Sequence, residues 1–362
     1  MSFLARALGR EAPRPGPKSI NLALQGGGAH GAFTWGVLDH LLADGRLTID
    51  GISGTSAGAV NAVMLADGLG KGGVEGGANE GRKRLAEFWR AASLGGDLPA
   101  VQRAVTDRLF SLLPASRNPA QAWLSAWTAF FSPYDFNPLN INPLKDLIER
   151  FVDFAALRAG ARDIFVGATN VQTGRLHVFS RDTLSAEAVM ASACLPTLFR
   201  AVEIDGVPYW DGGYTGNPVV SPFFRSTATE DLLIVQINPL MRKKVPHSNE
   251  EIMSRVQEIS FNSALLAELR GVAFINRLID EGRLPHGTDA TGFRRIKVHR
   301  IVLEGLGDRL SSASKLRTDF ESFELLRKLG VRAARRFLDK NYDAIGVRSS
   351  IDLGAELEAE RG

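Results

Sequence analysis

Two glycine-framed motifs stand close together near the start of the chain: Gly26-Gly27-Gly28-Ala29-His30-Gly31 and Gly54-Thr55-Ser56-Ala57-Gly58. Each follows a short apolar run, residues 20–24 and 47–52, and such runs bounded by glycine predict buried strands. Each also precedes a segment, residues 32–42 and 57–65, whose apolar or small side chains predict a helix. The strand–helix–strand–helix order predicts a parallel sheet.

The rest of the chain continues the same alternation. Further strands are predicted at residues 163–168, 176–179, 201–204, 207–210, 232–237 and 296–303. Helices are predicted over much of 82–136 and at 185–194, 250–278 and 314–338. The dipeptide Asp205-Gly206 predicts a hairpin between two of the short strands. The many glycines of residues 68–81 predict a flexible connection.

Composition excludes several classes of protein. Lys and Arg number 43 and Asp and Glu number 40, so the net charge of +3 is small. The sequence also has no basic stripe interleaved with aromatic residues, which is the pattern that would predict nucleic-acid binding. The single cysteine, Cys194, excludes an internal disulfide and a cysteine metal site, and its apolar surroundings predict a buried thiol. The first residues lack the apolar core of a signal peptide, so we expect a cytoplasmic protein.

The second motif places a serine where a strand turns sharply into a helix. Gly54 and Gly58, two residues on either side of Ser56, allow this turn, and Gly-x-Ser-x-Gly in this context is the pattern of a nucleophile elbow. The helix that begins at Ala57 would add partial positive charge near a developing negative one. A glycine-flanked serine that only caps the helix is the alternative interpretation.

The first motif has two interpretations. Its bare backbone N–H groups at a helix start can bind the oxyanion that forms when a serine attacks an ester. The spacing Gly26-x-Gly28-x-x-Gly31 also matches a dinucleotide-binding loop, with Asp50 near the place of a ribose-binding acid. A dinucleotide-dependent oxidoreductase is therefore a rival hypothesis.

A serine nucleophile needs a base, and the sequence offers two kinds. Asp211 ends a predicted strand and is followed by Gly212 and Gly213, which let the backbone approach a cleft closely. A histidine-dependent α/β-hydrolase would use a histidine after Asp211, which leaves His247, His286 and His299. None of these three stands in a sharp loop motif, so we favour a dyad in which Asp211 acts directly on Ser56.

The order of the motifs resembles the patatin-like phospholipase family. Gly26–Gly31, Gly54–Gly58 and Asp211–Gly213 match its G-x-G-x-x-G, G-x-S-x-G and D-G-[GA] motifs, and residues 191–196 match its A-S-x-x-[hydrophobic]-P stretch. The resemblance covers roughly residues 19–225. It implies Ser56 as nucleophile, Asp211 as base, an oxyanion hole from the glycine loop, and hydrolysis of lipid acyl esters without metal or cofactor. Many members have Arg or Lys where this chain has His30, a titratable residue in place of a permanently charged one.

This reading predicts an α/β fold, a three-layer α/β/α sandwich with a mostly parallel central sheet. The predicted division is a flexible lead-in (1–18), a patatin-like catalytic domain (19–225) with a helical insertion at about 82–136, and a C-terminal α/β extension (226–362) packed on the same core. The expected partners are a lipid or other acyl-ester substrate and, through peripheral contact, a lipid surface.

The predicted insertion contains aromatic residues at helical spacing: Trp123, Trp127, Phe130, Phe131 and Tyr134, followed by Phe136. They predict the buried face of a helix. The alternative is an interfacial lid, since Trp and Tyr favour membrane surfaces. A lid predicts that Trp127→Ala impairs activity on vesicles more than activity on a soluble ester. A third rival to the enzyme is a catalytically idle lipid-binding protein, which predicts an intact fold without ester turnover.

Overall fold

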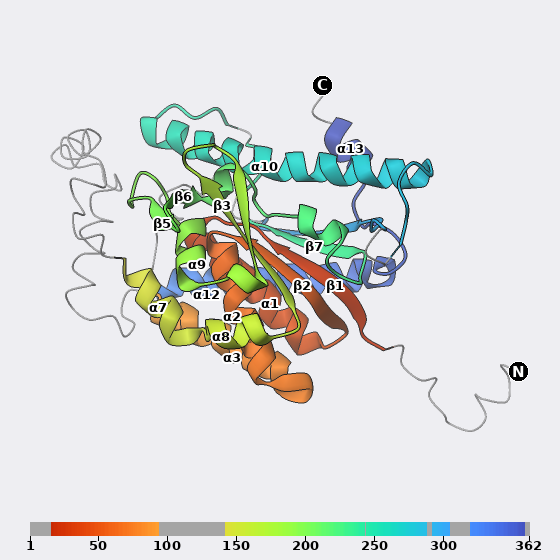
Figure 1. Ribbon diagram of the computed structural model, residues 1–362, viewed down its shortest axis with the longest axis horizontal. Coiled ribbons are helices and arrows are strands. Elements are labelled where there is room, and N and C mark those ends of the chain that lie inside the picture. Colours follow the sequence, from red (N-terminus) through yellow and green to blue (C-terminus); the bar gives the residue numbers. More distant parts are fainter. Residues whose placement is uncertain (1–15, 94–141, 243, 288–291, 305–318, 359–362) are drawn as a thin grey trace, which may run out of the picture.

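The computed structural model describes residues 16–93, 142–242, 244–287, 292–304 and 319–358 (Figure 1). Its core is one sheet of eight strands in the described residues, ordered β5-β6-β3-β2-β1-β7-β8, with β4 also paired to β3. The strands are β1 (Lys18–Leu24), β2 (Leu47–Thr55), β3 (Asp163–Asn170), β4 (Leu176–Ser180), β5 (Val202–Ile204), β6 (Val207–Asp211), β7 (Asp231–Gln236) and β8 (Lys297–Val302). The central strands β3, β2, β1, β7 and β8 are parallel, and β4, β5 and β6 pair antiparallel.

Helices cover both faces of this sheet, as Figure 1 shows. One face carries α1 (Gly31–Asp44), α2 (Ala57–Lys71), α3 (Gly73–Ala91) and α12 (Phe320–Asn341), which pack on one another. The other carries α10 (Asn249–Asp280), which contacts α13 (Leu353–Glu358). The shorter helices are α7 (Pro143–Phe151), α8 (Phe154–Ala159), α9 (Ala186–Ser192) and the 3₁₀ turns η2 (Gly28–His30), η3 (Arg181–Thr183), η4 (Gly212–Tyr214), η5 (Ser221–Phe224) and η7 (Tyr342–Ala344).

The alternation of side chains along buried strands explains the two layers. In β1, Leu22 and Leu24 belong to the larger core beneath α1, α2 and α12, whereas Ala23 belongs to the second core, beneath α10. Successive side chains of a strand point to opposite faces, so a run that is apolar at every position must be covered on both sides. The predicted three-layer α/β/α sandwich with a mostly parallel sheet is thus confirmed.

The glycine-rich stretch 68–81 is not the flexible connection that its composition predicted. It lies within α2 and α3, which are separated only at Gly72. A Cβ on Gly68 would lie 2.4 Å from the Cα of Gly81, so these glycines allow two helices to pack backbone against backbone. Here the absence of a side chain serves close packing rather than chain flexibility.

The predicted hairpin at Asp205-Gly206 is confirmed. Asp205 and Gly206 join β5 to β6 with φ values of 51° and 77°. Positive φ at both central residues is the geometry of the two-residue turn that matches the twist of the flanking strands. Of the predicted helical insertion, residues 82–91 continue α3, whereas the aromatic residues from Trp123 to Phe136 lie outside the described residues.

Residues after 225 contribute strands to the same sheet and helices to the layers that cover it. β7 pairs with β1, and β8 pairs with β7. Helix α12 crosses α1 at two glycines: a Cβ on Gly36 would lie 2.0 Å from the carbonyl oxygen of Arg327, and one on Gly330 would lie 2.1 Å from that of Phe33. The proposed domain boundary at residue 225 stays a prediction. None of the described helices is long and apolar enough to cross a membrane.

Candidate active site

Strands β2 and β6 end against each other along one edge of β3. Gly167 of β3 pairs with Thr55, the last residue of β2, and the next residue, Ala168, pairs with Asp211, the last residue of β6. Strand β4 pairs with Phe165–Thr169 and so occupies the opposite edge of β3. The carboxyl ends of β2 and β6 therefore meet on this edge of β3. Ser56, which follows Thr55, lies beside Asp211.

Ser56 occupies a strained turn between β2 and α2. Its φ of 55° and ψ of −125° are unusual for a residue with a side chain, and only 7% of its surface is exposed. A Cβ on Gly54 would lie 2.3 Å from the carbonyl oxygen of Gly58, and one on Gly58 would lie 2.0 Å from that of Leu24. The two glycines on either side of Ser56 are therefore required by close backbone contacts, as a nucleophile elbow demands.

Asp211 is completely buried and only partly hydrogen-bonded. Its Oδ1 accepts a hydrogen bond of 2.7 Å from the N–H of Gly213. Its Oδ2 has no partner of ordinary hydrogen-bond geometry among the described residues, although the Ser56 side chain lies near enough to lower the pKa. Burial outweighs both contacts and raises the pKa of Asp211 to about 7. A carboxylate with this pKa is a stronger base than an exposed aspartate.

One short segment at the end of α9, residues 192–194, holds the backbone of both residues. The N–H of Ser56 donates a hydrogen bond of 2.9 Å to Ser192 Oγ, and the N–H of Asp211 donates one of 2.8 Å to the carbonyl oxygen of Cys194. Ser192 is fully buried. Cys194 is buried as predicted, and burial raises the pKa of its thiol to about 12, which keeps it protonated.

The glycine loop lies directly against the elbow. A Cβ on Gly26 would lie 2.5 Å from the carbonyl oxygen of Thr55 and 2.6 Å from Ser56 Cβ, and one on Gly31 would lie 2.8 Å from Ala57 Cβ. Gly28 has a φ of 59° and is exposed amid buried neighbours, of which Ala29 and His30 complete η2. Gly28 and Ala29 are the first residues of η2, so their N–H groups have no acceptor within that turn.

Two buried asparagines that sequence reasoning missed hold this loop. Asn217 Oδ1 accepts a hydrogen bond of 2.6 Å from the N–H of Gly26, and Asn238 Nδ2 donates one of 2.7 Å to the carbonyl oxygen of Gly26. Gln25 Oε1 accepts the N–H groups of Ile237 and Asn238, each at 2.8 Å. Both asparagines precede proline: Asn217 comes four residues after the Asp-Gly-Gly motif, and Asn238 comes two residues after β7. That repeated Asn-Pro signal could have identified them.

The glycines after Asp211 are also required by contacts. A Cβ on Gly212 would lie 2.1 Å from the carbonyl oxygen of Gly167. One on Gly213 would lie 2.5 Å from the ring of Phe261, which belongs to α10. Helix α10 therefore forms one side of the site.

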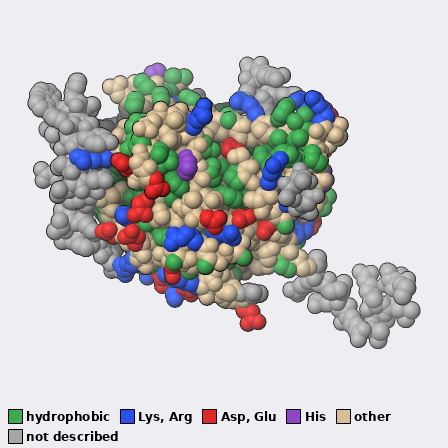
Figure 2. Space-filling view, in the orientation of Figure 1, with side chains coloured by type: hydrophobic (Ala, Val, Ile, Leu, Met, Phe, Trp, Pro, Cys, Tyr) green, Lys and Arg blue, Asp and Glu red, His purple; other side chains and the backbone are tan. Residues whose placement is uncertain are grey.

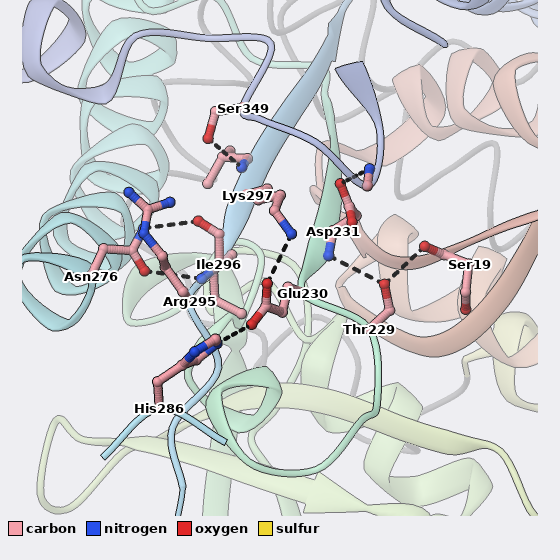
Figure 3. Close-up of polar contacts among 12 residues, drawn as sticks. Ser19, Thr229, Glu230, Asp231, Asn276, His286, Arg295, Ile296, Lys297 and Ser349 are labelled. Carbon is pink, nitrogen blue, oxygen red and sulfur yellow. Dashed lines mark hydrogen bonds and ion pairs between the residues drawn. The ribbon is translucent and has the colours of Figure 1, made fainter. Parts of the chain in front are cut away.

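The late histidines lie away from Ser56. His299 Nε2 pairs with Asp231 Oδ1 at 2.9 Å, and His286 Nε2 pairs with Glu230, which Lys297 also contacts at 2.8 Å. Figure 3 shows the cluster around Glu230 and Asp231, at the start of β7. Because β7 and β2 run parallel, this cluster is at the opposite end of the sheet from Ser56.

The remaining late histidine, His247, precedes α10 and is exposed. Helix α10 begins at Asn249, so Phe261 lies about 18 Å further along the helix at 1.5 Å per residue. Because Phe261 of α10 meets Gly213, His247 is remote from Asp211 and Ser56. The geometry therefore does not support a histidine-dependent hydrolase.

The ribose-binding role considered for Asp50 also finds no support. Asp50 Oδ2 accepts the N–H groups of Ala228 and Thr229 at 2.9 and 3.1 Å. It stands five residues before Thr55, the end of β2, whereas a ribose-binding acid stands at the end of its strand. Its carboxylate fixes the connection that leads into β7.

Several solved structures are similar to this chain at low sequence identity. A search of curated proteins finds no match. Among solved structures, VipD from Legionella pneumophila has 15% identity and a TM-score of 0.42, covering 89% of this chain and 67% of that one. The ExoU–SpcU complex from Pseudomonas aeruginosa has 16% identity and a TM-score of 0.36, covering 92% and 53%. This chain thus spans about half the length of that relative.

A family model matches a large part of this chain. The sequence model described as "Patatin-like phospholipase" matches residues 22–224, which is more than half of the chain and includes all the motifs around Ser56 and Asp211. The chain belongs to the patatin-like phospholipase family of lipid ester hydrolases.

Proposed function

We propose that this protein hydrolyses lipid acyl esters through an acyl-enzyme on Ser56, with Asp211 as the base. The observation that carries the proposal is the meeting of β2 and β6 on one edge of β3, which brings the two side chains together without an intervening histidine. The raised pKa of Asp211, about 7, suits a group that must take a proton near neutral pH.

The reaction would proceed in two steps. In the first, Asp211 Oδ2 accepts the Ser56 proton while Ser56 Oγ attacks the ester carbonyl carbon. The N–H groups of Gly27, Gly28 and Ala29 stabilise the resulting oxyanion, and the alcohol leaves with the proton that Asp211 returns. In the second step Asp211 takes a proton from water, whose oxygen attacks the acyl-enzyme; the bond to Ser56 Oγ breaks, Asp211 returns the proton to Oγ, and the fatty acid is released.

The site is tested by labelling with a fluorophosphonate, which reacts with activated serines. Mass spectrometry of the digested protein is expected to place the adduct on Ser56. Ser56→Ala should abolish labelling at this position. It should also lower ester turnover by several orders of magnitude, as removal of the nucleophile does in other serine hydrolases. Asp211→Asn should strongly slow both while the protein stays folded. Labelling at another serine, or normal turnover by either variant, would refute the dyad.

Domain organisation and location belong to the proposed function as well. We propose that residues 19–225 form the catalytic domain, that residues 226–362 pack on it as an extension, and that the protein acts in the cytoplasm in peripheral contact with lipid surfaces. The two asparagines that hold Gly26 belong one to each part. Because Asn238 lies in the extension, a chain truncated after residue 225 would lose half of the support of its glycine loop and should be inactive.

A further inference from the structure

Large hydrophobic side chains are exposed together beside the active site. Six of them fall within residues 241–259: Met241, Val245, Ile252, Met253, Val256 and Ile259. We call this set the α10 apolar surface. Met241 and Val245 are 80% and 74% exposed. Figure 2 shows hydrophobic side chains gathered at the upper left of the view, over the N-terminal end of α10. Contiguous exposed apolar groups mark sites of interaction.

The periodicity of α10 shows that this exposure is systematic. Ile252, Val256 and Ile259 recur at positions i, i+4 and i+7 and so form one stripe along the helix. The buried residues Glu258, Phe261 and Leu265 lie on the opposite side of the same helix, facing the sheet and the site. A helix with polar residues outside would need no partner, but α10 carries a second apolar face directed away from the protein.

The α10 apolar surface adjoins the catalytic loops. It begins three residues after Asn238, which bonds to Gly26, and Phe261 of the same helix packs on Gly213. Arg255 and Asn262 bond to the carbonyl oxygens of Leu240 and Pro239, so the connecting loop lies along α10. A body that covers this surface would therefore lie on the outer side of α10, whose inner side contacts the loop that carries Gly213.

Charged residues flank the α10 apolar surface in the connecting loop and in α10 itself. The connecting loop reads Met241-Arg242-Lys243-Lys244-Val245, three cations between two exposed apolar residues. Two acids near the surface are hydrogen-bonded: buried Glu258 accepts from both Arg242 and Arg255, and exposed Glu251 accepts the N–H groups of His247 and Ser248. Apolar side chains flanked by Lys and Arg match the apolar interior and anionic headgroups of a lipid bilayer.

We propose that the α10 apolar surface docks the protein on an anionic lipid bilayer, with Met241, Val245 and Met253 inserted among the headgroups and acyl chains. This proposal rests on the proposed function, because it assigns to the surface the delivery of bilayer lipid to Ser56. Docking here leaves the opposite end of the sheet, with Glu230 and Asp231, in solution.

The test compares two sites on the full-length protein. The surface variant is Val245→Asp with Met253→Asp, and the matched control is Val347→Asp, because Val347 is 72% exposed and follows Gly346, whose N–H bonds to Asp231 at the far end of the sheet. Binding is measured by co-sedimentation with vesicles of ether-linked phosphatidylcholine, with or without phosphatidylglycerol, since ether lipids resist ester hydrolysis. Turnover is measured on ester-lipid vesicles and on a soluble short-chain ester.

The wild type should bind the anionic vesicles more tightly than the neutral ones. The surface variant should lose about tenfold or more in binding and in vesicle turnover, because two apolar side chains no longer insert. Its turnover of the soluble ester should be unchanged, and the control should match the wild type throughout. Lys244→Glu should weaken binding to the anionic vesicles alone, by about fivefold or more for the altered charge.

Several results would overturn the proposal. They are absent vesicle binding by the wild type, equal losses in the control, or undiminished binding by the surface variant. A different result would assign the surface to a second copy of the chain instead. In that case the wild type is a dimer in size-exclusion chromatography, the surface variant is a monomer, and neither binds vesicles. Vesicle binding without ester turnover would retain the docking surface and refute the proposed function, so the two failures are distinguishable.

Discussion

The backbone N–H of Ser56 donates a hydrogen bond of 2.9 Å to the hydroxyl oxygen of Ser192, a residue 136 positions away in the sequence. The bond reaches the one residue of the elbow whose backbone is strained. Strained conformations persist only where surrounding contacts determine them. We therefore expect Ser192 to be a positioning residue, which would act on the proposed reaction through the place and orientation of Ser56.

Ser192→Ala should lower kcat about tenfold or more with little change in KM, because the elbow loses the contact that holds it. The rate of fluorophosphonate labelling at Ser56 should fall in parallel, and Ser192→Thr, which keeps a hydroxyl acceptor, should recover part of both. The matched control is Ser53→Ala: Ser53 is also buried, and its hydroxyl bonds to the carbonyl oxygen of Val219 rather than to the elbow. Both alanine variants should lose about 1–3 kcal/mol of stability. Equal kcat values in the two would contradict the positioning role.

The pH profile of turnover should follow Asp211. Burial raises the pKa of this carboxyl to about 7, and only the ionised form can accept the Ser56 proton. The value of kcat/KM on a soluble ester should therefore rise with pH through about 7 and level off above it. Stopped-flow or steady-state rates across this range measure the midpoint. A profile already flat from pH 5 upward would mean that a group with an ordinary carboxyl pKa is the base.

The stability of the fold should also depend on the protonation of Asp211. It should fall as the pH rises, whereas turnover should increase. The carboxyl has a pKa of about 7 in the folded protein against 3.8 as its ordinary value, so the folded state holds its proton more tightly. Its contribution to stability is thus fully present below about pH 4 and is lost as the pH rises through about 7. Asp211→Asn should be more stable than the wild type at pH 8, by about 2–4 kcal/mol, with a smaller difference at pH 5. Denaturant titrations at both values test this, and a destabilised Asn variant at pH 8 would contradict it.

Gly26→Ala should abolish most of the activity without unfolding the protein. The new methyl group would press on the carbonyl oxygen of Thr55 and on Ser56 Cβ, so the glycine loop and the elbow must separate. Steric overpacking of this kind costs about 1–3 kcal/mol, and turnover should fall about a hundredfold as the loop N–H groups leave the oxyanion. The control is Gly70→Ala in α2, where a Cβ meets nothing within 4 Å and should be neutral or slightly stabilising. Activity and melting temperature are compared across the two variants.

The three late histidines should be dispensable for catalysis. His247→Ala and His286→Ala should keep the turnover of the wild type, because both side chains are exposed and remote from Ser56. His299→Ala should lower stability, since His299 is buried against Asp231, but its kcat should persist at temperatures where the protein is folded. A loss of several orders of magnitude in kcat in any folded variant of the three would restore the histidine-dependent mechanism.

Local sequence was a reliable guide wherever a residue type has only one structural use. Positive φ at Asp205 and Gly206 and the close contacts of Gly54 and Gly58 follow from short-range sterics, which the motifs encode directly. The same reasoning failed at residues 68–81. Glycine composition cannot tell a flexible link from two helices in contact, because the second helix is part of the surroundings and not of the local sequence.

By itself the sequence determined the α/β alternation, the elbow serine, the glycine loop and the candidate aspartate, since each depends on neighbours within a few residues. The tertiary structure decided which of these meet. It brought Ser56 and Asp211 to one edge of β3, placed Ser192, Asn217 and Asn238 behind them, and used His286 and His299 elsewhere. Such meetings depend on strand order and register, which are set by the burial of the whole sheet between two helical layers, and no local pattern specifies them.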